Sequence, residues 1–465
     1  MNLNERLKRD PRLLYRLAFI GALPMLLSPL IECLSELLAP PVNSKFFGTD
    51  QRYPATVGLI QTFALTIAVF VWIIFLYRRI LSKEPVGKQL RAYLPLSIFL
   101  LLVVWLLINV PITGSQAFLT EGSDYRNEST LTFILYFAGY FLFGMLLTTE
   151  RIRRWFLGTF IAAGTVLGIL TLIHVWFAPL PFFHEGILDT LSGIFYNSNH
   201  FGYYLTMVVI AAACGAVLGT TRLTRLLCLG SLAVNTAVLI LDDTLGCFLA
   251  VFATLIVLVV LVYLVFSKQE PEQRKAVRIR VWITAGVFLA ISVAMSFFYE
   301  SLFSSFLKTI FELDQLTDGK DINAGSGRLK MWQHTVRFIT EKPVFGHGTE
   351  GIGRRLYMLT NFDRPHNEYL QHAAFWGIPF LLVYLGGCIC TLLQALRNGF
   401  YRSPGVAICF FASLAYMLSA FFGNTMYYTA PFFFLLLGVV ASGSHTEVMP
   451  VTKPFEMPEG LTKND

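Results

Sequence analysis

Apolar residues in this chain are gathered into long runs separated by short polar stretches, for example 64–76, 94–110, 248–266 and 431–440. Roughly 20 apolar residues cross a bilayer as a helix, and several runs exceed what a core helix needs. The pattern predicts an all-α polytopic membrane protein with about twelve transmembrane helices. The predicted spans are 14–38, 55–77, 92–110, 130–149, 155–178, 200–219, 226–241, 245–266, 281–298, 367–396, 404–422 and 426–442.

Basic residues predict the orientation of these spans, because Lys and Arg gather in cytoplasmic loops. One face, with both termini, collects 24 of the 36 basic residues, whereas the short connections of the other face hold only Lys45, Arg52 and Arg126. Only an even number of spans keeps every basic cluster on one side. We therefore expect both termini in the cytoplasm. The other nine basic residues lie in one outer segment, about 299–366, which is long enough to be largely exempt from the rule.

Composition supports this class. Hydrophobic residues make up 55% of the chain and charged residues 14%, whereas a soluble domain carries nearer a quarter charged, which argues against a soluble enzyme. All seven cysteines fall in or beside apolar runs, so no disulfide framework is expected. Basic loops beside anionic lipid account for the net charge of +7, which gives no reason to expect nucleic acid as a partner.

Four segments follow from this map. Residues 1–298 hold the first nine predicted spans, 299–366 form one large extracytoplasmic loop, 367–443 hold the last three spans, and 444–465 form a polar cytoplasmic tail. A long loop between spans is functional when it is structured, and this one has helical patterns.

The loop is predicted to contain amphipathic helices. Segment 326–342 has apolar residues at helical spacing, with Ser326 as a plausible N-cap and Pro343 as the stop. Its predicted apolar face is Leu329, Trp332, Val336 and Ile339. Segment 304–313 has a similar pattern. We expect these helices to lie on the membrane surface, where the head group of a lipid-linked substrate would be presented.

Two kinds of residue in the loop are candidates for chemistry. His366 stands where the loop turns into the tenth span, and a neutral imidazole there can accept a proton; the alternative is an interfacial histidine that caps the helix. Arg328 begins the amphipathic helix, and Arg354, Arg355 and Arg364 follow it. A guanidinium fork suits a diphosphate, although snorkelling to lipid phosphate explains many interfacial arginines. We favour Arg328 over the other three.

A polar run precedes the sixth span at its outer end: Asn197, Ser198, Asn199 and His200. Amide side chains there could bind sugar hydroxyls or cap the helix. The run holds more polarity than a cap requires, so we predict a substrate contact.

Two other patterns are set aside. Residues 346–351 satisfy GxGxxG, but no strand precedes them and no βαβ unit surrounds them, which excludes a dinucleotide site and leaves a tight turn. Glu312 and Asp314 point about 200° apart on a helix, so a shared metal would need a local break. No metal or other cofactor is predicted.

These motifs, in this order, resemble the O-antigen ligase and O-antigen polymerase family of bacterial surface-polysaccharide assembly. The resemblance rests on residues 193–200 (GIFYNSNH), on Ser326-Gly327-Arg328 with Trp332, Pro343 and Gly346-His347-Gly348, and on residues 364–370 (RPHNEYL). With the span count and the single large outer loop, it covers about residues 130–440.

The resemblance implies a GT-C-like glycosyltransferase of the bacterial inner membrane. It would take a glycan from undecaprenyl diphosphate at the outer face and pass it, with inversion and without a metal, to a hydroxyl of a glycan, glycolipid or protein. His366 would be the general base and Arg328 would neutralise the diphosphate. The implied substrate-binding residues are Asn197, Asn199, His200, Arg354, Arg364 and Asn367.

One position departs from the family pattern. Members often carry an arginine just before the Ser-Gly-x-Phe stretch, and the matching position here is Thr190. The second phosphate-binding cation is therefore expected elsewhere, from Arg364, Arg354 or His200 in that order of preference.

The acceptor is left open by the residues alone. A ligase, a repeat-unit polymerase and a protein O-oligosaccharyltransferase share this chemistry. A lipid-linked glycan flippase belongs to another class, and it would place charged residues within the spans along a path. The middle of most predicted spans holds none, which favours an enzyme.

Overall fold

A computed structural model describes fifteen α-helices and one short antiparallel pair, β1 (Lys45–Phe46) with β2 (Thr49–Asp50). The described residues are 12–38, 45–46, 49–50, 65–66, 69, 94–120, 122, 126, 128–147, 149–183, 191–195, 197–265, 271–298 and 327–443. The α-helices are α2 (Arg12–Leu26), α3 (Ser28–Leu38), α6 (Leu94–Thr113), α7 (Thr130–Leu146), α8 (Glu150–Trp176), α9 (Ser198–Leu218), α10 (Arg222–Leu241), α11 (Leu245–Val265), α12 (Pro271–Phe298), α14 (Arg328–Glu341), α15 (Gly353–Thr360), α16 (Glu368–Trp376), α17 (Ile378–Arg397), α18 (Pro404–Ser419) and α19 (Ala430–Ser442). Three short 3-10 helices are η1 (Gln116–Phe118), η3 (Phe400–Arg402) and η4 (Ala420–Phe422).

Seven of the described helices are long and apolar enough to cross a membrane: α8, α9, α10, α11, α12, α17, and α18 continued by η4. Shorter apolar stretches occur in α6, α7 and α19. The prediction of a multi-pass membrane protein is confirmed. The predicted second span, 55–77, lies largely outside the described residues, so the total of twelve stays a prediction.

Two predicted spans are broken, and the prediction of a single helix for each was wrong. Span 14–38 divides into α2 and α3, and Pro29 near the break lacks the N–H that would continue the hydrogen bonding. Span 367–396 divides at Gly377, whose φ of 91° and ψ of 164° are not helical. Non-helical backbone within a membrane protein must be covered by other protein. Accordingly, eight of the nine residues of α16 are buried.

The connection between η4 and α19 lies inside the bundle. The twelfth span was predicted to begin at 426, but α19 begins at Ala430, and all of residues 423–429 are buried. This buried link brings polar side chains, among them Asn424, beside the end of the outer loop.

A helix occurs where the loop was predicted to have one, with two differences. Its N-cap is Gly327, with φ 77°, and not Ser326. Its buried stripe is Met331, Thr335, Phe338 and Ile339. Only Ile339 was predicted on the buried face, and Val336 is 47% exposed. The stripe is rotated because α14 packs against α16.

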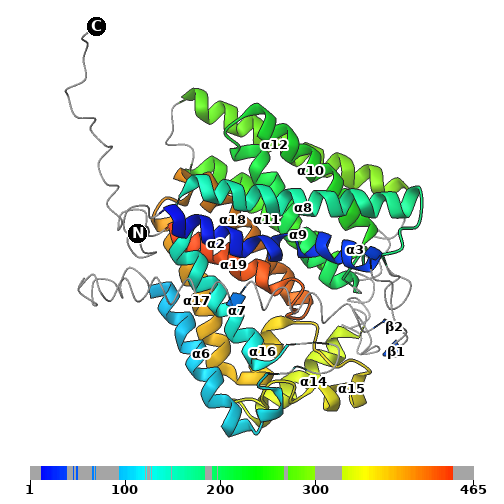
Figure 1. Ribbon diagram of the computed structural model, residues 1–465, viewed down its shortest axis with the longest axis vertical. Helices are drawn as coiled ribbons and strands as arrows, with labels where there is room; N and C mark the ends of the chain where they lie inside the picture. The colour runs from blue at the N-terminus through cyan, green and yellow to red at the C-terminus, as the bar shows by residue number, and fades with distance from the viewer. Residues whose placement is uncertain are drawn as a thin grey trace, which may run out of the picture.

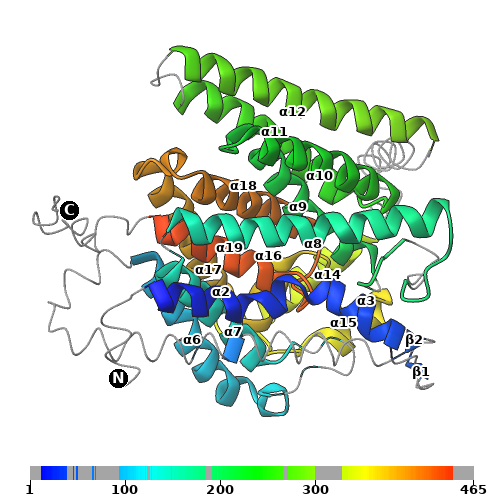
Figure 2. The same cartoon turned by 45° about the horizontal axis from the view of Figure 1, so that its top comes forward.

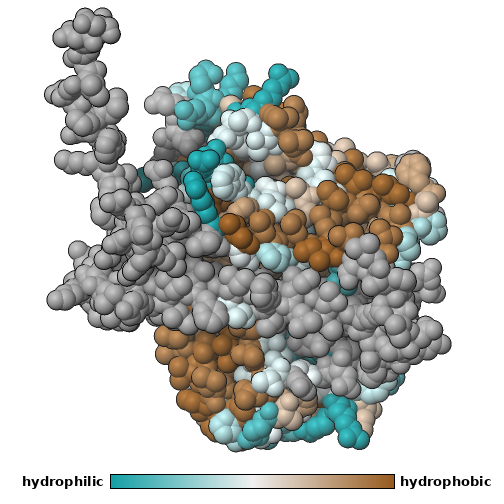
Figure 3. All heavy atoms as spheres, viewed as in Figure 1, coloured by the Kyte–Doolittle hydropathy of each residue, from teal (hydrophilic) through white to brown (hydrophobic). Residues whose placement is uncertain are grey.

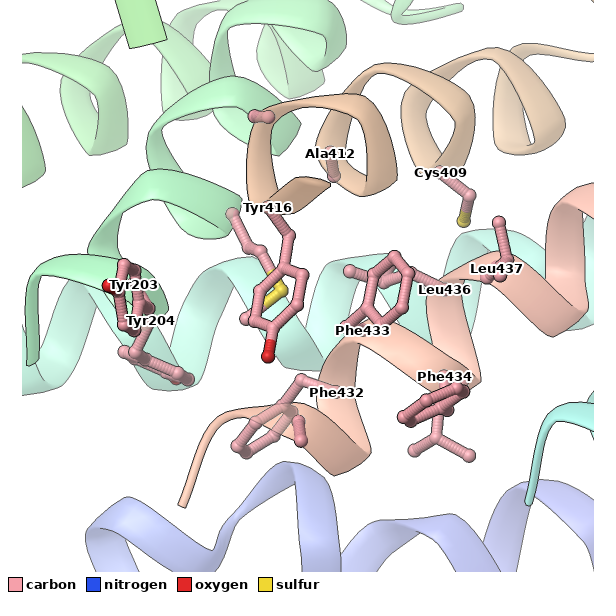
Figure 4. Close-up of a cluster of buried hydrophobic side chains, with 14 of the residues drawn as sticks. Tyr203, Tyr204, Cys409, Ala412, Tyr416, Phe432, Phe433, Phe434, Leu436 and Leu437 are labelled. Atoms are coloured by element: carbon pink, nitrogen blue, oxygen red, sulfur yellow. The ribbon is translucent and has the colours of Figure 1, made fainter. Parts of the chain in front are cut away.

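The core lies where α9, α18 and α19 meet (Figure 4). Tyr203 and Tyr204 come from α9, Tyr416 comes from α18, and Phe433 from α19 stacks on Tyr416 with ring centroids 4.4 Å apart. The helix α9 is buried over nearly its whole length. Large apolar residues also cover much of the exterior, as the hydrophobic areas in Figure 3 show, which is expected where helices face lipid.

The two ends of the bundle differ in character. The N-terminal ends of α8 and α12, which hold two of the basic clusters, lie at the left of Figure 2, and α14 and α15 lie at the right. Figure 1 shows α14, α15 and α16 gathered at one end of the molecule. These two basic clusters thus lie apart from α14 and α15. Which end faces the cytoplasm is still a prediction.

Cysteine labelling tests that orientation. Lys342, after α14, and Arg222, at the start of α10, are both exposed. In a cysteine-free background, Lys342→Cys should react with a membrane-impermeant thiol reagent in spheroplasts, and Arg222→Cys should react only after permeabilisation. Equal labelling of both in sealed spheroplasts would refute the orientation.

Candidate active site

His366 is held in an unusual backbone conformation at the entrance to α16. Its φ is 48°, in the left-handed region that residues other than glycine seldom adopt. Its backbone N–H donates at 2.8 Å to Oδ1 of Asn424, which lies in the buried link that precedes α19. Its ring meets Phe362 edge to face, with centroids 5.6 Å apart. Such constrained residues concentrate at functional sites.

The residues that follow His366 fix α16 in place. Asn367 is the N-cap, and its Oδ1 accepts a hydrogen bond from Leu370 N at 3.0 Å. The buried Glu368 accepts hydrogen bonds from Tyr384 Oη at 2.7 Å and Tyr416 Oη at 2.9 Å. These tyrosines belong to α17 and α18, so one carboxylate ties three helices together. The helix cap that was the alternative role for His366 is therefore supplied by Asn367.

Arg328 reaches the same place from the outer loop. It is the first residue of α14, and its Nη2 donates to Asn199 Oδ1 at 3.4 Å. Trp332 Nε1 donates to the carbonyl oxygen of Pro365 at 2.8 Å, which fixes α14 to the residue just before His366. The structure therefore brings Arg328, Asn199 and His366 together from three elements that are distant in sequence.

The imidazole of His366 is neutral at physiological pH. Burial is the largest cause that lowers its pKa, and the positive charges of Arg328 and Arg126 add to the effect. Asp363 opposes them, but the pKa still falls to about 3. A neutral imidazole can accept a proton from a hydroxyl.

The run before α9 divides into different roles. Asn197 is the N-cap of α9, and its Oδ1 accepts from Asn199 N at 2.9 Å. Asn199 uses its own amide oxygen for Arg328. His200 is buried near the ring of Tyr428, and its Nδ1 has no hydrogen-bond partner within the described part of the chain. Asn199 and His200 thus stay candidates for substrate contact, whereas the capping alternative describes Asn197.

The remaining loop arginines differ in their availability. Arg364 is buried, pairs with Glu350 and lies over the ring of Phe375 at 5.1 Å. Arg355 pairs with Glu341 at 2.8 Å on the surface. Arg354 is exposed on α15. The contacts of Arg364 favour a structural role over the predicted role as second diphosphate cation.

An ion pair that sequence reasoning missed lies beside His366. Arg126 holds Asp363 in a bidentate contact, with Nε to Oδ2 at 2.9 Å and Nη2 to Oδ1 at 2.6 Å. A signal for Arg126 did exist, because it is one of only three basic residues in the short outer connections. Asn424 was also missed, and its residue type in a predicted short turn gave no signal.

Charges in this region are largely balanced, with one exception. Arg126 is paired with Asp363, and Arg364 with Glu350. Burial raises the pKa of the nearby Glu128 carboxyl to about 8, so this group is mostly uncharged at pH 7. Among the described residues, no carboxylate forms an ion pair with Arg328. Its charge at a helix N-terminus is therefore available to an anion.

The structure also locates the GxGxxG run at residues 346–351. A helix and a turn precede Gly346, and not a strand. A Cβ added at Gly346 would lie 2.5 Å from the backbone of Phe375, and one added at Gly348 would lie 2.5 Å from Oγ1 of Thr113. The glycines serve a closely packed turn. Within the described segments no group of three or more His, Cys, Asp or Glu residues could hold a metal. Thr190, segment 304–313, Glu312 and Asp314 lie outside the described residues.

Comparison with known proteins gives one match. Residues 231–385, about a third of the chain, match the family model described as O-antigen ligase. A comparison with curated proteins found no match. The matched segment includes Arg328 and His366 with the whole described outer loop, and the resemblance is confirmed for the motifs at 326–348 and 364–370. The motif at 193–200 lies outside the matched segment. Over residues 231–385 this chain is therefore similar to the O-antigen ligase family.

Proposed function

We propose that this protein transfers a glycan from undecaprenyl diphosphate to an acceptor hydroxyl at the extracytoplasmic face of the inner membrane. The observation that carries the proposal is the placement of Arg328, a cation without a carboxylate partner among the described residues, beside the neutral His366. Arg328 suits the diphosphate of the donor, and His366 suits the hydroxyl of the acceptor.

The reaction would be a direct displacement. The acceptor oxygen attacks the anomeric carbon, the bond from that carbon to the diphosphate oxygen breaks, and the anomeric configuration inverts. His366 accepts the proton of the hydroxyl. Arg328 and the N–H groups at the start of α14 offset the charge that develops on the leaving diphosphate. A diphosphate is already a good leaving group, so this scheme needs no metal.

The acceptor decides between ligase, repeat-unit polymerase and protein O-oligosaccharyltransferase, and all three use the same step. A flippase for lipid-linked glycans would move the donor without breaking the glycosyl bond. We favour transfer because Arg328, at the start of α14, lies close enough to His366 to lower the pKa of its imidazole, which places a cation and a proton acceptor beside each other.

Release of the lipid product tests the proposal. Purified protein is incubated with undecaprenyl-diphosphate glycan and an acceptor glycolipid, with and without EDTA. We expect free undecaprenyl diphosphate in both samples. Movement of intact donor across a vesicle with no lipid product would instead support the flippase, and loss of turnover in EDTA with rescue by magnesium would contradict the arginine-based mechanism.

The pH profile should report on His366. The neutral imidazole is the active form, and its pKa is lowered in the free enzyme, so activity is retained as pH falls through 6.5. The acid limb of kcat/KM, which reports the free enzyme, should therefore lie well below pH 6.5. Bound diphosphate adds negative charge beside Arg328, which raises the pKa, so the acid limb of kcat should lie at higher pH.

Variants sharpen this pH test. Arg328→Gln removes a positive charge that lowers the pKa of His366, so the kcat/KM limb should move to higher pH. Arg355→Gln is the matched control, because Arg355 pairs with Glu341 on the surface, and its limb should not move. An acid limb near 6.5 that is the same in all three proteins would contradict the assignment.

A further inference from the structure

A second positively charged site lies between α11 and α12, at the end of the bundle away from the outer loop. The two helices border a hollow of about 650 Å³. Its described lining includes the basic residues Arg274, Lys275 and Arg278, the aromatic residues Tyr263 and Trp282, and no acidic residue. The hollow is therefore suited to an anion and has aromatic walls.

Tyr263 orders the basic and aromatic groups of this hollow. Arg278 and Trp282 are one helical turn apart on α12, so they lie on one stripe. Trp282 Nε1 donates to Tyr263 Oη at 2.9 Å, and the Arg278 guanidinium carbon lies 4.4 Å from the centroid of the Tyr263 ring. Arg278 Nε is buried and has no hydrogen-bond partner in the described part of the chain. The Nε–H of Arg278 is thus available to donate a hydrogen bond to a bound anion.

The same stripe becomes apolar toward the middle of the span. Ile279 and Ile283 line the hollow and are 51% and 50% exposed, and Trp282 is 57% exposed. Figure 3 shows hydrophilic residues at the upper end of the molecule, where Figure 1 places α12, with hydrophobic residues next to them. Tryptophan favours the boundary between head groups and acyl chains. The lining thus changes from charged residues at 274–278 to aliphatic and aromatic residues at 279–283, as a phospholipid changes from head group to acyl chains.

We propose that this hollow binds one anionic phospholipid of the leaflet at the basic end of the helices. Lys275 and Arg278 hold the head-group phosphate, and the acyl chains lie along Ile279 and Ile283. Basic pockets between membrane helices select anionic head groups by charge, and a guanidinium matches phosphate geometry. The lipid would fasten α12 to α11, since α12 lies at the edge of the bundle and much of its surface is exposed.

Native mass spectrometry of the full chain tests this site. Wild-type protein mixed with phosphatidylglycerol should retain one molecule at detergent levels that remove phosphatidylcholine. Lys275→Gln/Arg278→Gln should retain one molecule fewer, and its thermal stabilisation by phosphatidylglycerol should fall by at least half. Arg151→Gln/Arg154→Gln is the matched control, because Arg151 lies over Trp155 at 5.0 Å on the same face without lining this hollow. It should behave as the wild type.

Competition with a soluble phosphate ester tests whether the hollow binds a lipid or a free phosphate compound. Glycerol 3-phosphate at millimolar concentration should not displace the lipid, because it has no acyl chains for the isoleucines. Displacement by glycerol 3-phosphate would overturn the lipid assignment. Equal retention by the wild type and Lys275→Gln/Arg278→Gln, both unfolding at the same temperature without lipid, would remove the site altogether.

Discussion

Replacing His366 with alanine is expected to abolish glycan transfer and to leave the binding of donor lipid nearly unchanged. A general base contributes about 10²–10⁴-fold in rate, so only traces of product should form. Loss of a simple helix cap would cost about 1 kcal/mol of stability and spare most activity. In this protein that role belongs to Asn367, and the two effects can be separated.

Arg328 should show the complementary behaviour. Arg328→Ala should weaken both donor binding and turnover, because the proposed diphosphate contact is made before and during the reaction. Arg328→Lys keeps the charge without the fork, and we expect most activity to be lost. Arg355→Ala is the control, since Arg355 is held by Glu341 away from the site.

Glycan transfer by the His366 and Arg328 variants is measured as product formed from a labelled donor. Donor binding is measured in a separate assay in detergent. Near-normal turnover by folded His366→Ala protein would contradict the proposed base. His200, whose buried Nδ1 has no hydrogen-bond partner among the described residues, would then be the next residue to test.

Gly377→Ala should prevent the protein from folding correctly. A Cβ at this position would lie 1.7 Å from the carbonyl oxygen of Val344, and the φ of 91° is unfavourable for any L side chain. Backbone strain of this kind costs about 1–3 kcal/mol, and the clash adds to it. We expect a large loss of monodisperse protein in detergent and a lowered unfolding temperature.

Gly386 provides the matched control in the same predicted span. It lies within α17, and nothing is within 4 Å of an added Cβ. Gly386→Ala should leave stability unchanged or raise it by up to about 1 kcal/mol, because alanine favours the helix. Equal yields and unfolding temperatures for the two variants would show that the break at Gly377 is not required.

The sequence predicted most of the helices, and it also pointed to the candidate site residues. Apolar runs located the spans, and the motifs singled out Arg328 and His366, which the structure brings close together. The break at Gly377 was harder to predict, because Gly377 stands in a sequence apolar enough to continue a helix. Only packing against the outer loop, where a Cβ at Gly377 would meet Val344, decides that it does not. A short turn was predicted after residue 422, but not that α19 begins as late as Ala430.

Long-range polar pairing was the other part that could not be predicted. Arg126 and Asp363 are 237 positions apart, and no local pattern connects them. The buried stripe of α14 was misplaced for the same reason, since its partner α16 was taken as part of a membrane span. Such contacts depend on tertiary structure that a periodicity does not encode.

The pairing of early helices with late segments has a consequence for biosynthesis. Trp105 Nε1 of α6 donates to the carbonyl oxygen of Trp376 at 2.9 Å, Asn109 Nδ2 donates to that of Phe345 at 2.6 Å, and the hydroxyls of Thr130 and Thr349 are 2.9 Å apart. These partners are separated by 219 to 271 positions. Residues 105–130 thus leave the ribosome long before residues 345–376, their hydrogen-bond partners, have been synthesised. A nascent chain that stops short of the outer loop lacks Arg328 and His366, so the proposed site can assemble only late in translation.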